Sequence, residues 1–181
     1  MRVSYDWLKT MIDIPEDPKT LSDEYIRTGT EVEAIDTVGE SFDHVVTAQV
    51  LTKTPHPDSD HMYVCSVDVG DKNLDADGNP APLQIVCGAP NCRAGLKVLC
   101  ATVGTVLYPG GGDEEFKIKR SKIRGVESLG MLCAEDELGI GASHDGIMEL
   151  PADARVGMTA KEYLGIEDDY LIEIGLTPNR V

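Results

Sequence analysis

Basic side chains are concentrated in one segment of an otherwise acidic chain. Five Lys or Arg residues fall within the nine residues 116–124, although the 181-residue chain carries 16 Lys and Arg against 32 Asp and Glu and a formal net charge of −16. Crowding like charges costs electrostatic free energy, so this run calls for an explanation. A row of ammonium groups is suited to following a phosphate backbone, which it can contact without reading bases.

The same run alternates with a period of two, which predicts a strand. Side chains at even positions would point to one face and those at odd positions to the other: Phe116, Ile118 and Arg120, then Lys117, Lys119 and Ser121. One face would join a core, and the other would present ammonium groups to solvent. A solvated strand face without a ligand is the alternative, because exposed lysines are common.

The predicted phosphate contacts are Lys117, Lys119, Lys122 and Arg124. His56 and Asn91, both in predicted loops, are further candidates: an imidazole can donate to phosphate, and an amide can bind ribose or phosphate. Each also has a structural interpretation. His56 and Asp58 can order a turn, and Asn91 can close its loop by a hydrogen bond.

Patterns for catalysis and metal binding do not emerge. We find no Ser-His-Asp arrangement, no paired carboxylates and no adenylate-binding motif, and Gly110, Gly111 and Gly112 lack the surrounding G-x4-G-K-[ST], so they predict a mobile hairpin. The five cysteines are odd in number and lie in apolar surroundings, which favours reduced, buried thiols, Cys133 included. Cys87 and Cys92 form no C-x2-C pair, so no metal site is expected.

Composition points to a globular protein of one or two domains, with 41% hydrophobic and 27% charged residues. No apolar run approaches the about 20 residues that cross a bilayer, and the first residues lack a signal-peptide apolar region. We therefore expect a cytoplasmic protein with no membrane partner. A pI of about 4.5 argues against indiscriminate nucleic-acid binding and predicts weak, salt-sensitive contacts.

The elements that would position these residues fall into three parts. In the first part, Ser4 caps a short helix, Asp17-Pro18 opens a second helix that stops at Gly29, and a strand covers residues 31–36. Short β runs separated by turns then predict a small barrel or sandwich: 45–51, 62–69, 83–87, 97–101, the basic run and 146–150. A short helix is expected at residues 135–139. In the third part, a capping box at residues 159–162 starts a helix, and the strand 170–174 could pair with the first part.

Three motifs occur in the order found in a tRNA-binding oligonucleotide-fold domain: HPDSDHM at 56–62 leading to VDVG at 67–70, IVCGAPN at 85–91, and SKIRGVESLGMLC at 121–133. The flanks SYDWL at 4–8, TGTEVE at 28–33 and LTPNR at 176–180 resemble the bacterial phenylalanyl-tRNA synthetase β chain. The resemblance covers essentially the whole chain.

The resemblance implies a mainly β chain with an α+β flank. A five-stranded OB-fold barrel, residues 41–151, would be inserted into a small helical and strand domain split between residues 1–40 and 152–181. The chain would stop before the rest of a longer β chain, because residues 176–181 carry no cap or terminating loop.

By the same resemblance, the chain is a non-catalytic, accessory tRNA-binding module of the ligase that attaches phenylalanine to its tRNA. The partners would be tRNA and the α subunit of an α2β2 assembly, and no DNA is expected. ATP and magnesium would serve the full enzyme, whose aminoacylation site lies on the α chain, and this part would hold no cofactor. Two alternatives stay open. The chain could be a structural module for β-chain packing, which the net charge favours, or a free-standing tRNA-binding or chaperone-like OB protein, which the flanks disfavour.

Overall fold

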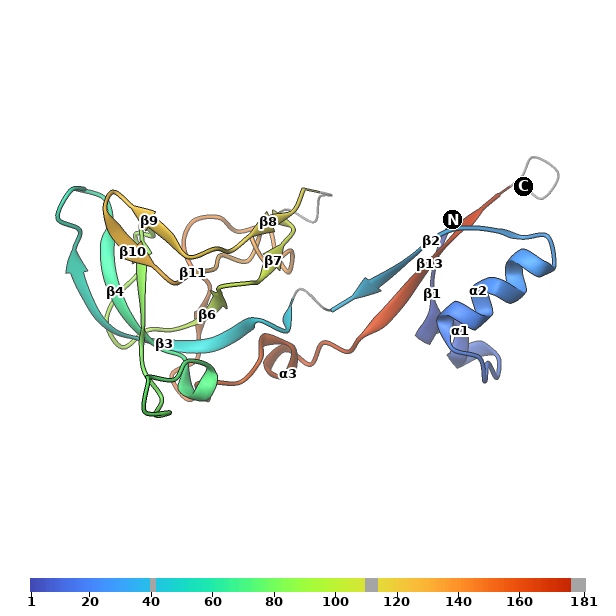
Figure 1. The fold of residues 1–181 in the computed structure, drawn as a ribbon, viewed down its shortest axis with the longest axis horizontal. Helices are drawn as coiled ribbons and strands as arrows, with labels where there is room; N and C mark the ends of the chain where they lie inside the picture. Colours follow the sequence, from blue (N-terminus) through green and yellow to red (C-terminus); the bar gives the residue numbers. More distant parts are fainter. Residues whose placement is uncertain (40–41, 110–113, 177–181) are drawn as a thin grey trace. The chain divides into compact units, whose positions relative to one another are not determined.

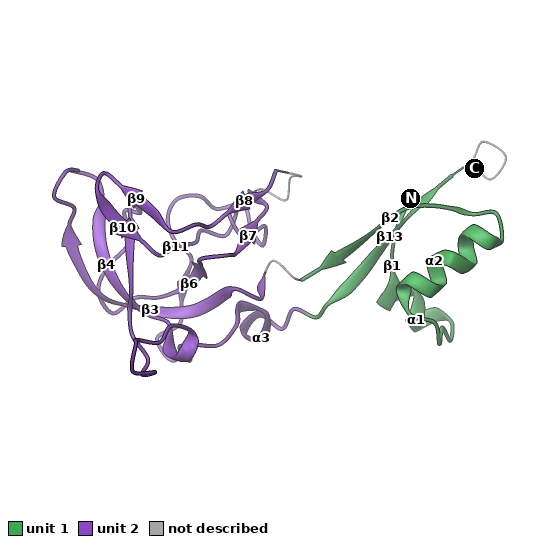
Figure 2. Ribbon diagram, viewed as in Figure 1, with its two compact units in different colours: residues 1–40, 167–181 green, residues 41–166 purple. Residues whose placement is uncertain are grey.

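The computed structural model describes residues 1–39, 42–109 and 114–176, and the chain folds into two compact units (Figures 1 and 2). Unit 1 contains Met1–Glu40 and Glu167–Val181, and unit 2 contains Ser41–Ile166. The chain therefore leaves unit 1 once, builds unit 2, and returns. The expectations for residues 110–112 and 177–181 lie outside the described residues.

Two capped helices and a three-stranded antiparallel sheet form unit 1. The Ser4 hydroxyl accepts a hydrogen bond from the Trp7 N–H at the start of α1 (Tyr5–Met11), and Asp17 caps α2 (Pro18–Arg27). Both helices are confirmed, because their start signals are local. The sheet order is β1 (Arg2–Ser4), β13 (Asp169–Gly175) and β2 (Glu31–Val38), so the last strand pairs with the first part of the chain as predicted.

Unit 2 is an OB-like barrel, which confirms the predicted fold class. Its strands are β3 (Val45–Pro55), β4 (Tyr63–Asp68), β5 (Leu83–Cys87), β6 (Lys97–Thr102) and β11 (Gly130–Leu132), with a short 3-10 helix η2 (Gly70–Lys72) after β4. The antiparallel order is β11-β6-β3-β4-β5. The Leu129 N–H donates to the Gln84 carbonyl at 2.9 Å, and the Val86 N–H donates to the Ser128 hydroxyl at 3.1 Å. These two bonds bring the β11 side of the sheet against β5 and nearly close the barrel.

Alternating side chains of these strands fill the barrel, as the period of two requires. Val50, Cys65, Val67 and Ile85 are among the fully buried ones. All five cysteines are buried and free, as predicted. Burial raises the pKa of Cys100 to about 12 and that of Cys133 well above its ordinary value, so both stay protonated thiols.

The segment after the barrel belongs to unit 2 as far as Ile166, whereas the sequence placed a boundary at residue 151. The reason is a set of bonds to β3: the buried Thr47 donates its N–H to the Met158 carbonyl at 2.8 Å and its hydroxyl to the Arg155 carbonyl at 2.6 Å. This segment contains α3 (Ala160–Leu164), which has the predicted capping box and ends at Gly165, and it follows β12 (Glu149–Leu150). Among the described residues, no helix is long and apolar enough to cross a membrane.

Two local predictions were wrong. The basic run is not one strand: β8 (Phe116–Lys117) pairs with β7 (Val106–Leu107), and β9 (Ser121–Ile123) pairs with β10 (Val126–Ser128). Only Ile118 of the predicted core face is buried, and Phe116 is 49% exposed. The Ile118 backbone makes two further bonds beside this ladder, to Gly104 and Thr105, and the next strand pairs with a different partner. Residues 135–139 form turns rather than the predicted helix, and the Glu137 carboxylate there accepts from the Ala134 N–H at 2.7 Å.

Candidate nucleic-acid interface

The basic residues lie on a tight hairpin beside the barrel. Strands β9 and β10 pair Ile123 with Val126 and Lys122 with Glu127. Between them, Arg124 and Gly125 have φ angles of +45° and +84°. Two successive left-handed residues match the two-residue hairpin turn whose twist suits antiparallel strands. An Arg-Gly pair between two short β runs was the available sequence signal for this turn, and sequence reasoning missed it.

His56 braces this hairpin against the first loop of the barrel. Its ring is buried, with Nε2 lying 3.0 Å from the Ile123 carbonyl oxygen and Nδ1 accepting from the Asp58 N–H at 3.0 Å. Because Nδ1 accepts, Nε2 carries the proton and donates to Ile123. Arg124 makes a second link between the hairpin and this loop, because its Nη1 donates to the Asp58 carbonyl at 2.9 Å. Both nitrogens of His56 are thus used within the protein, which agrees with its turn-ordering interpretation.

The three lysines predicted as phosphate contacts present their ammonium groups to solvent. Lys117, Lys119 and Lys122 are exposed and form no ion pair with any residue that the structure describes. Arg120 differs, because its guanidinium pairs with Glu127 at 2.7 Å. The exposed guanidinium of Arg124 adds a fourth cation at the hairpin tip, although one of its donors is used by Asp58.

This segment stands out against the charge of both units. Unit 1 contains five basic and fourteen acidic residues, and unit 2 contains eleven basic and eighteen acidic residues. Five of the eleven basic residues in unit 2 lie between positions 117 and 124, where there is no acidic residue. The hairpin and the residues leading into it therefore form the part of the chain best suited to a polyanion.

Asn91 is held within its own loop. Its Nδ2 donates to the Ile147 carbonyl at 2.8 Å, and its Oδ1 accepts from the Ile147 N–H at 3.0 Å. The amide also donates to Glu149, whose carboxylate is bound by Arg93 at 2.7 Å. A side chain at Gly146 would lie 2.4 Å from Asn91 Oδ1, so glycine is required for this close approach. This geometry agrees with the loop-closing interpretation of Asn91.

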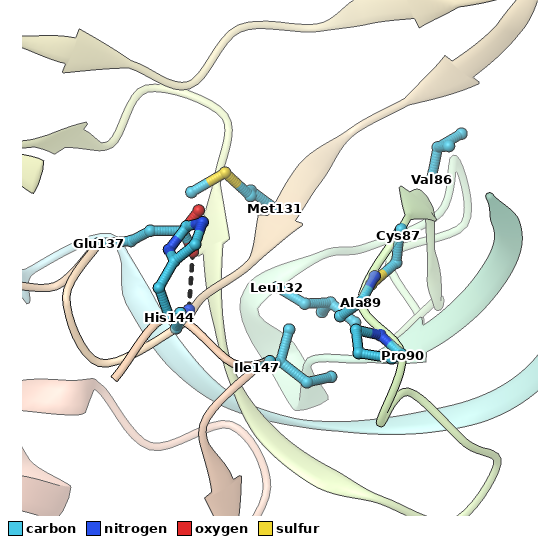
Figure 3. A pocket seen from close by; sticks show the side chains of 12 residues that line it. Val86, Cys87, Ala89, Pro90, Met131, Leu132, Glu137, His144 and Ile147 are labelled. Atoms are coloured by element: carbon cyan, nitrogen blue, oxygen red, sulfur yellow. Dashed lines mark hydrogen bonds between the residues drawn. The ribbon is translucent and has the colours of Figure 1, made fainter. Parts of the chain in front are cut away.

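A hollow of about 330 Å³ lies where two of the sequence motifs meet (Figure 3). Its walls come from residues 86–90 and from Met131, Leu132, Ala134 and Ile147. Its polar rim contains the Glu137 carboxylate and His144, which pairs with Asp136 at 2.9 Å. The Glu137 carboxylate in this rim would repel phosphate, and none of the basic residues at positions 117–124 lines the hollow.

Metal-ligating side chains do not gather elsewhere in the described ranges: no group of three or more His, Cys, Asp or Glu residues there could hold a metal ion. The chemistry available on the hairpin is therefore that of fixed positive charges and hydrogen-bond donors.

Comparison with known proteins agrees with this chemistry. Residues 45–159 match the family described as putative tRNA binding domain. The chain belongs to that family. The tRNA binding domain spans nearly all of unit 2, including β3 and the hairpin, and ends at Thr159, the residue that caps α3.

Similarity to known proteins is not confined to the tRNA binding domain but also covers unit 1. The chain is 51% identical to the phenylalanine–tRNA ligase beta subunit of Porphyromonas gingivalis over 184 residues, 48% identical to that of Bacteroides fragilis over 183, and 43% identical to that of Coxiella burnetii over 180. These alignments cover 99–100% of this chain and 21% of each relative. The chain thus spans about a fifth of the length of these relatives.

Proposed function

We propose that Lys117, Lys119, Lys122 and Arg124 bind the phosphate backbone of tRNA. The observation that carries this proposal is that three exposed lysines, with no ion pair among the described residues, lie on and beside a hairpin that His56 and Arg124 brace against the barrel. A braced hairpin holds the cations together before binding, so it avoids the conformational entropy that a flexible loop would lose on binding.

Binding of this kind is electrostatic and follows backbone shape. Each neutralised phosphate releases counterions, so three to four contacts predict a slope of roughly −2 to −4 in log K against log[salt]. Aromatic residues make up only 5% of the chain, which limits base stacking as a source of affinity. The net charge of −16 opposes association, so we expect weak binding by this chain alone.

We further propose that the chain is the N-terminal part of a phenylalanine–tRNA ligase beta subunit, in which it serves as a non-catalytic accessory module. The support is the identity of about half over the whole chain to proteins of that name. The whole enzyme would act in the cytoplasm with an α subunit in an α2β2 assembly. By the same similarity, ATP and magnesium would serve the full enzyme.

The test is tRNA binding by this chain across a salt series, measured for wild type and for Lys117→Gln/Lys119→Gln/Lys122→Gln. The triple variant should weaken binding at low salt and make the slope shallower by about two to three. Lys9→Gln/Lys19→Gln/Arg27→Gln is the matched control, because it removes three exposed positive charges from α1 and α2 of unit 1. If the two triple variants weaken tRNA binding equally, only the net charge matters, and the proposed site is overturned.

The second candidate is a structural module for packing of the beta subunit, favoured by the net charge of −9 carried by unit 1. It predicts no tRNA binding by wild type even at low salt. It also predicts that the lysine triple impairs assembly of the full enzyme rather than its affinity for tRNA.

A further inference from the structure

Three polar side chains lie in one row across the outer face of the barrel. The strand registers pair Thr52 of β3 with Ser66 of β4, and Ser66 with Gln84 of β5. The next row, Lys53, Cys65 and Ile85, has fully buried side chains at Cys65 and Ile85. Because neighbouring positions of a strand face opposite sides, the row of Thr52, Ser66 and Gln84 faces outward.

This row lines a hollow of about 380 Å³ that has no charged side chain in its lining. Neither the Thr52 nor the Ser66 hydroxyl forms a hydrogen bond with a residue in the described ranges. The neighbouring Thr54 differs, because its hydroxyl donates to the Val64 carbonyl at 3.1 Å. Two adjacent hydroxyls therefore retain their donors and acceptors for a ligand.

The row continues into the basic hairpin. Gln84 Nε2 donates to the Glu127 carbonyl at 2.8 Å, and Glu127 pairs in register with Lys122. A strand-to-strand path thus leads from the two hydroxyls, through Gln84, to one of the exposed lysines. A nucleic-acid strand whose phosphates reach Lys122 would have its neighbouring sugars along this path.

Ribose has the chemistry that such a row can recognise. Its 2′-hydroxyl is both a donor and an acceptor, as are the hydroxyls of Thr and Ser, and deoxyribose has no such group. Adjacent strands lie about 4.8 Å apart, so the hydroxyls of Thr52 and Ser66 are close enough to act on one sugar or on its phosphate. Phosphate contacts alone would not distinguish the two sugars.

We infer that Thr52 and Ser66 form a ribose-binding subsite that makes this chain prefer RNA to DNA. The inference rests on the proposed function, because the lysines supply most of the affinity. Each hydrogen bond to a 2′-hydroxyl would favour RNA by about twofold to tenfold.

The test compares single-stranded RNA and DNA of matching sequence, labelled with a fluorophore and about 16 nucleotides long, the upper site size for one OB fold. Anisotropy titrations at low salt would use wild type, Thr52→Val/Ser66→Ala and Thr37→Val. Thr37 is an exposed residue of strand β2 in unit 1, so its variant removes a strand hydroxyl outside the site. Thermal unfolding of each variant checks that the fold is kept.

Wild type and Thr37→Val should bind RNA several-fold more tightly than DNA, and Thr52→Val/Ser66→Ala should bind both equally, at the affinity of wild type for DNA. The lysine triple variant should lower affinity for RNA and DNA by similar factors. Equal binding of RNA and DNA by wild type, or an RNA preference that survives in the double variant, would overturn the ribose subsite and leave the lysine site standing. Absence of binding to either strand would overturn the ribose subsite, and the tRNA titration described above would then decide separately whether the lysine site stands.

Discussion

His56 Nε2 lies 3.0 Å from the carbonyl oxygen of Ile123, and this bond ties the first loop of the barrel to the basic hairpin. The ring is 4% exposed, so the bond is shielded from water. A hairpin of two three-residue strands has little stability of its own, and the buried ring supplies a fixed point for it. The position of the cations therefore depends on a residue that carries none of the proposed phosphate contacts.

Replacing His56 should loosen the hairpin. His56→Ala removes two hydrogen bonds and leaves the Ile123 carbonyl without its partner, which should lower the free energy of unfolding by about 1–3 kcal/mol in urea titrations. Amide hydrogen exchange should rise at residues 121–128, and tRNA affinity should fall. His61→Ala, an exposed site in the same loop, should stay within about 0.5 kcal/mol of wild type. Unchanged exchange in the hairpin of His56→Ala would contradict the bracing role.

Substitutions at Arg124 should separate turn geometry from charge. Arg124 has φ +45°, which Asn adopts more readily than Arg, while both Asn and Lys lose the bond to the Asp58 carbonyl. The free energy of unfolding of Arg124→Asn should therefore lie within about 1 kcal/mol of the wild-type value. Its salt slope for tRNA binding should be shallower by the contribution of about one phosphate contact. Arg124→Lys should keep the slope and be the less stable of the two. The reverse order of stability would show that the turn is not strained by its side chain.

The amide of Asn91 should matter for stability more than for binding. Asn91→Ala leaves the buried N–H and carbonyl of Ile147 without partners and should lower the free energy of unfolding by about 2 kcal/mol. Asn91→Asp keeps the acceptor but places a charge beside Glu149, so it should be at least as destabilised at neutral pH. Where the Asn91→Ala variant is folded, its affinity for tRNA should lie within about twofold of the wild-type affinity. A loss of tRNA affinity at unchanged stability would instead make Asn91 a ligand.

His144 should titrate above its ordinary value. The hydrogen bond to Asp136 and the charge of that carboxylate raise the pKa of His144 from 6.5. The pKa of His144 is higher in the folded chain than in the unfolded chain. The ion pair therefore stabilises the fold at a pH below the unfolded-state pKa, and this stabilisation is lost as the pH rises through the folded-state pKa. Proton NMR should show a raised midpoint in wild type that returns toward 6.5 in Asp136→Asn. An unchanged midpoint in that variant would exclude the pair as the cause.

The thiols should be unreactive in the folded chain. All five are buried, and burial holds the pKa of Cys100 at about 12. A thiol-specific disulfide reagent at mild alkaline pH should therefore label the native protein slowly and all five cysteines rapidly in denaturant. Cys133→Ala should leave tRNA affinity unchanged. Fast labelling of Cys133 in the native state would contradict its placement as an inert core residue.

Elements with local signals could be predicted from the sequence. Ser4, Asp17 and the Thr159 capping box each act within a few residues of a helix start, so their helices form where the sequence places them. Alternating apolar residues likewise marked β3 to β6, and three ordered motifs marked the family. The clustering of basic residues at positions 117–124 can be read directly from the sequence, because it is a property of local composition.

Long-range contacts decided the rest. His56 reaches Ile123 across 67 positions, and Asn91 reaches Ile147 across 56, so no local pattern distinguishes these structural side chains from ligands. The basic run became two separate strands because its two parts pair with different partners, β8 with β7 and β9 with β10. The row of Thr52, Ser66 and Gln84 exists only through the registers of three strands. Side-chain type is local, but a site is a set of positions in space, and in a barrel the pairing of distant strands sets those positions.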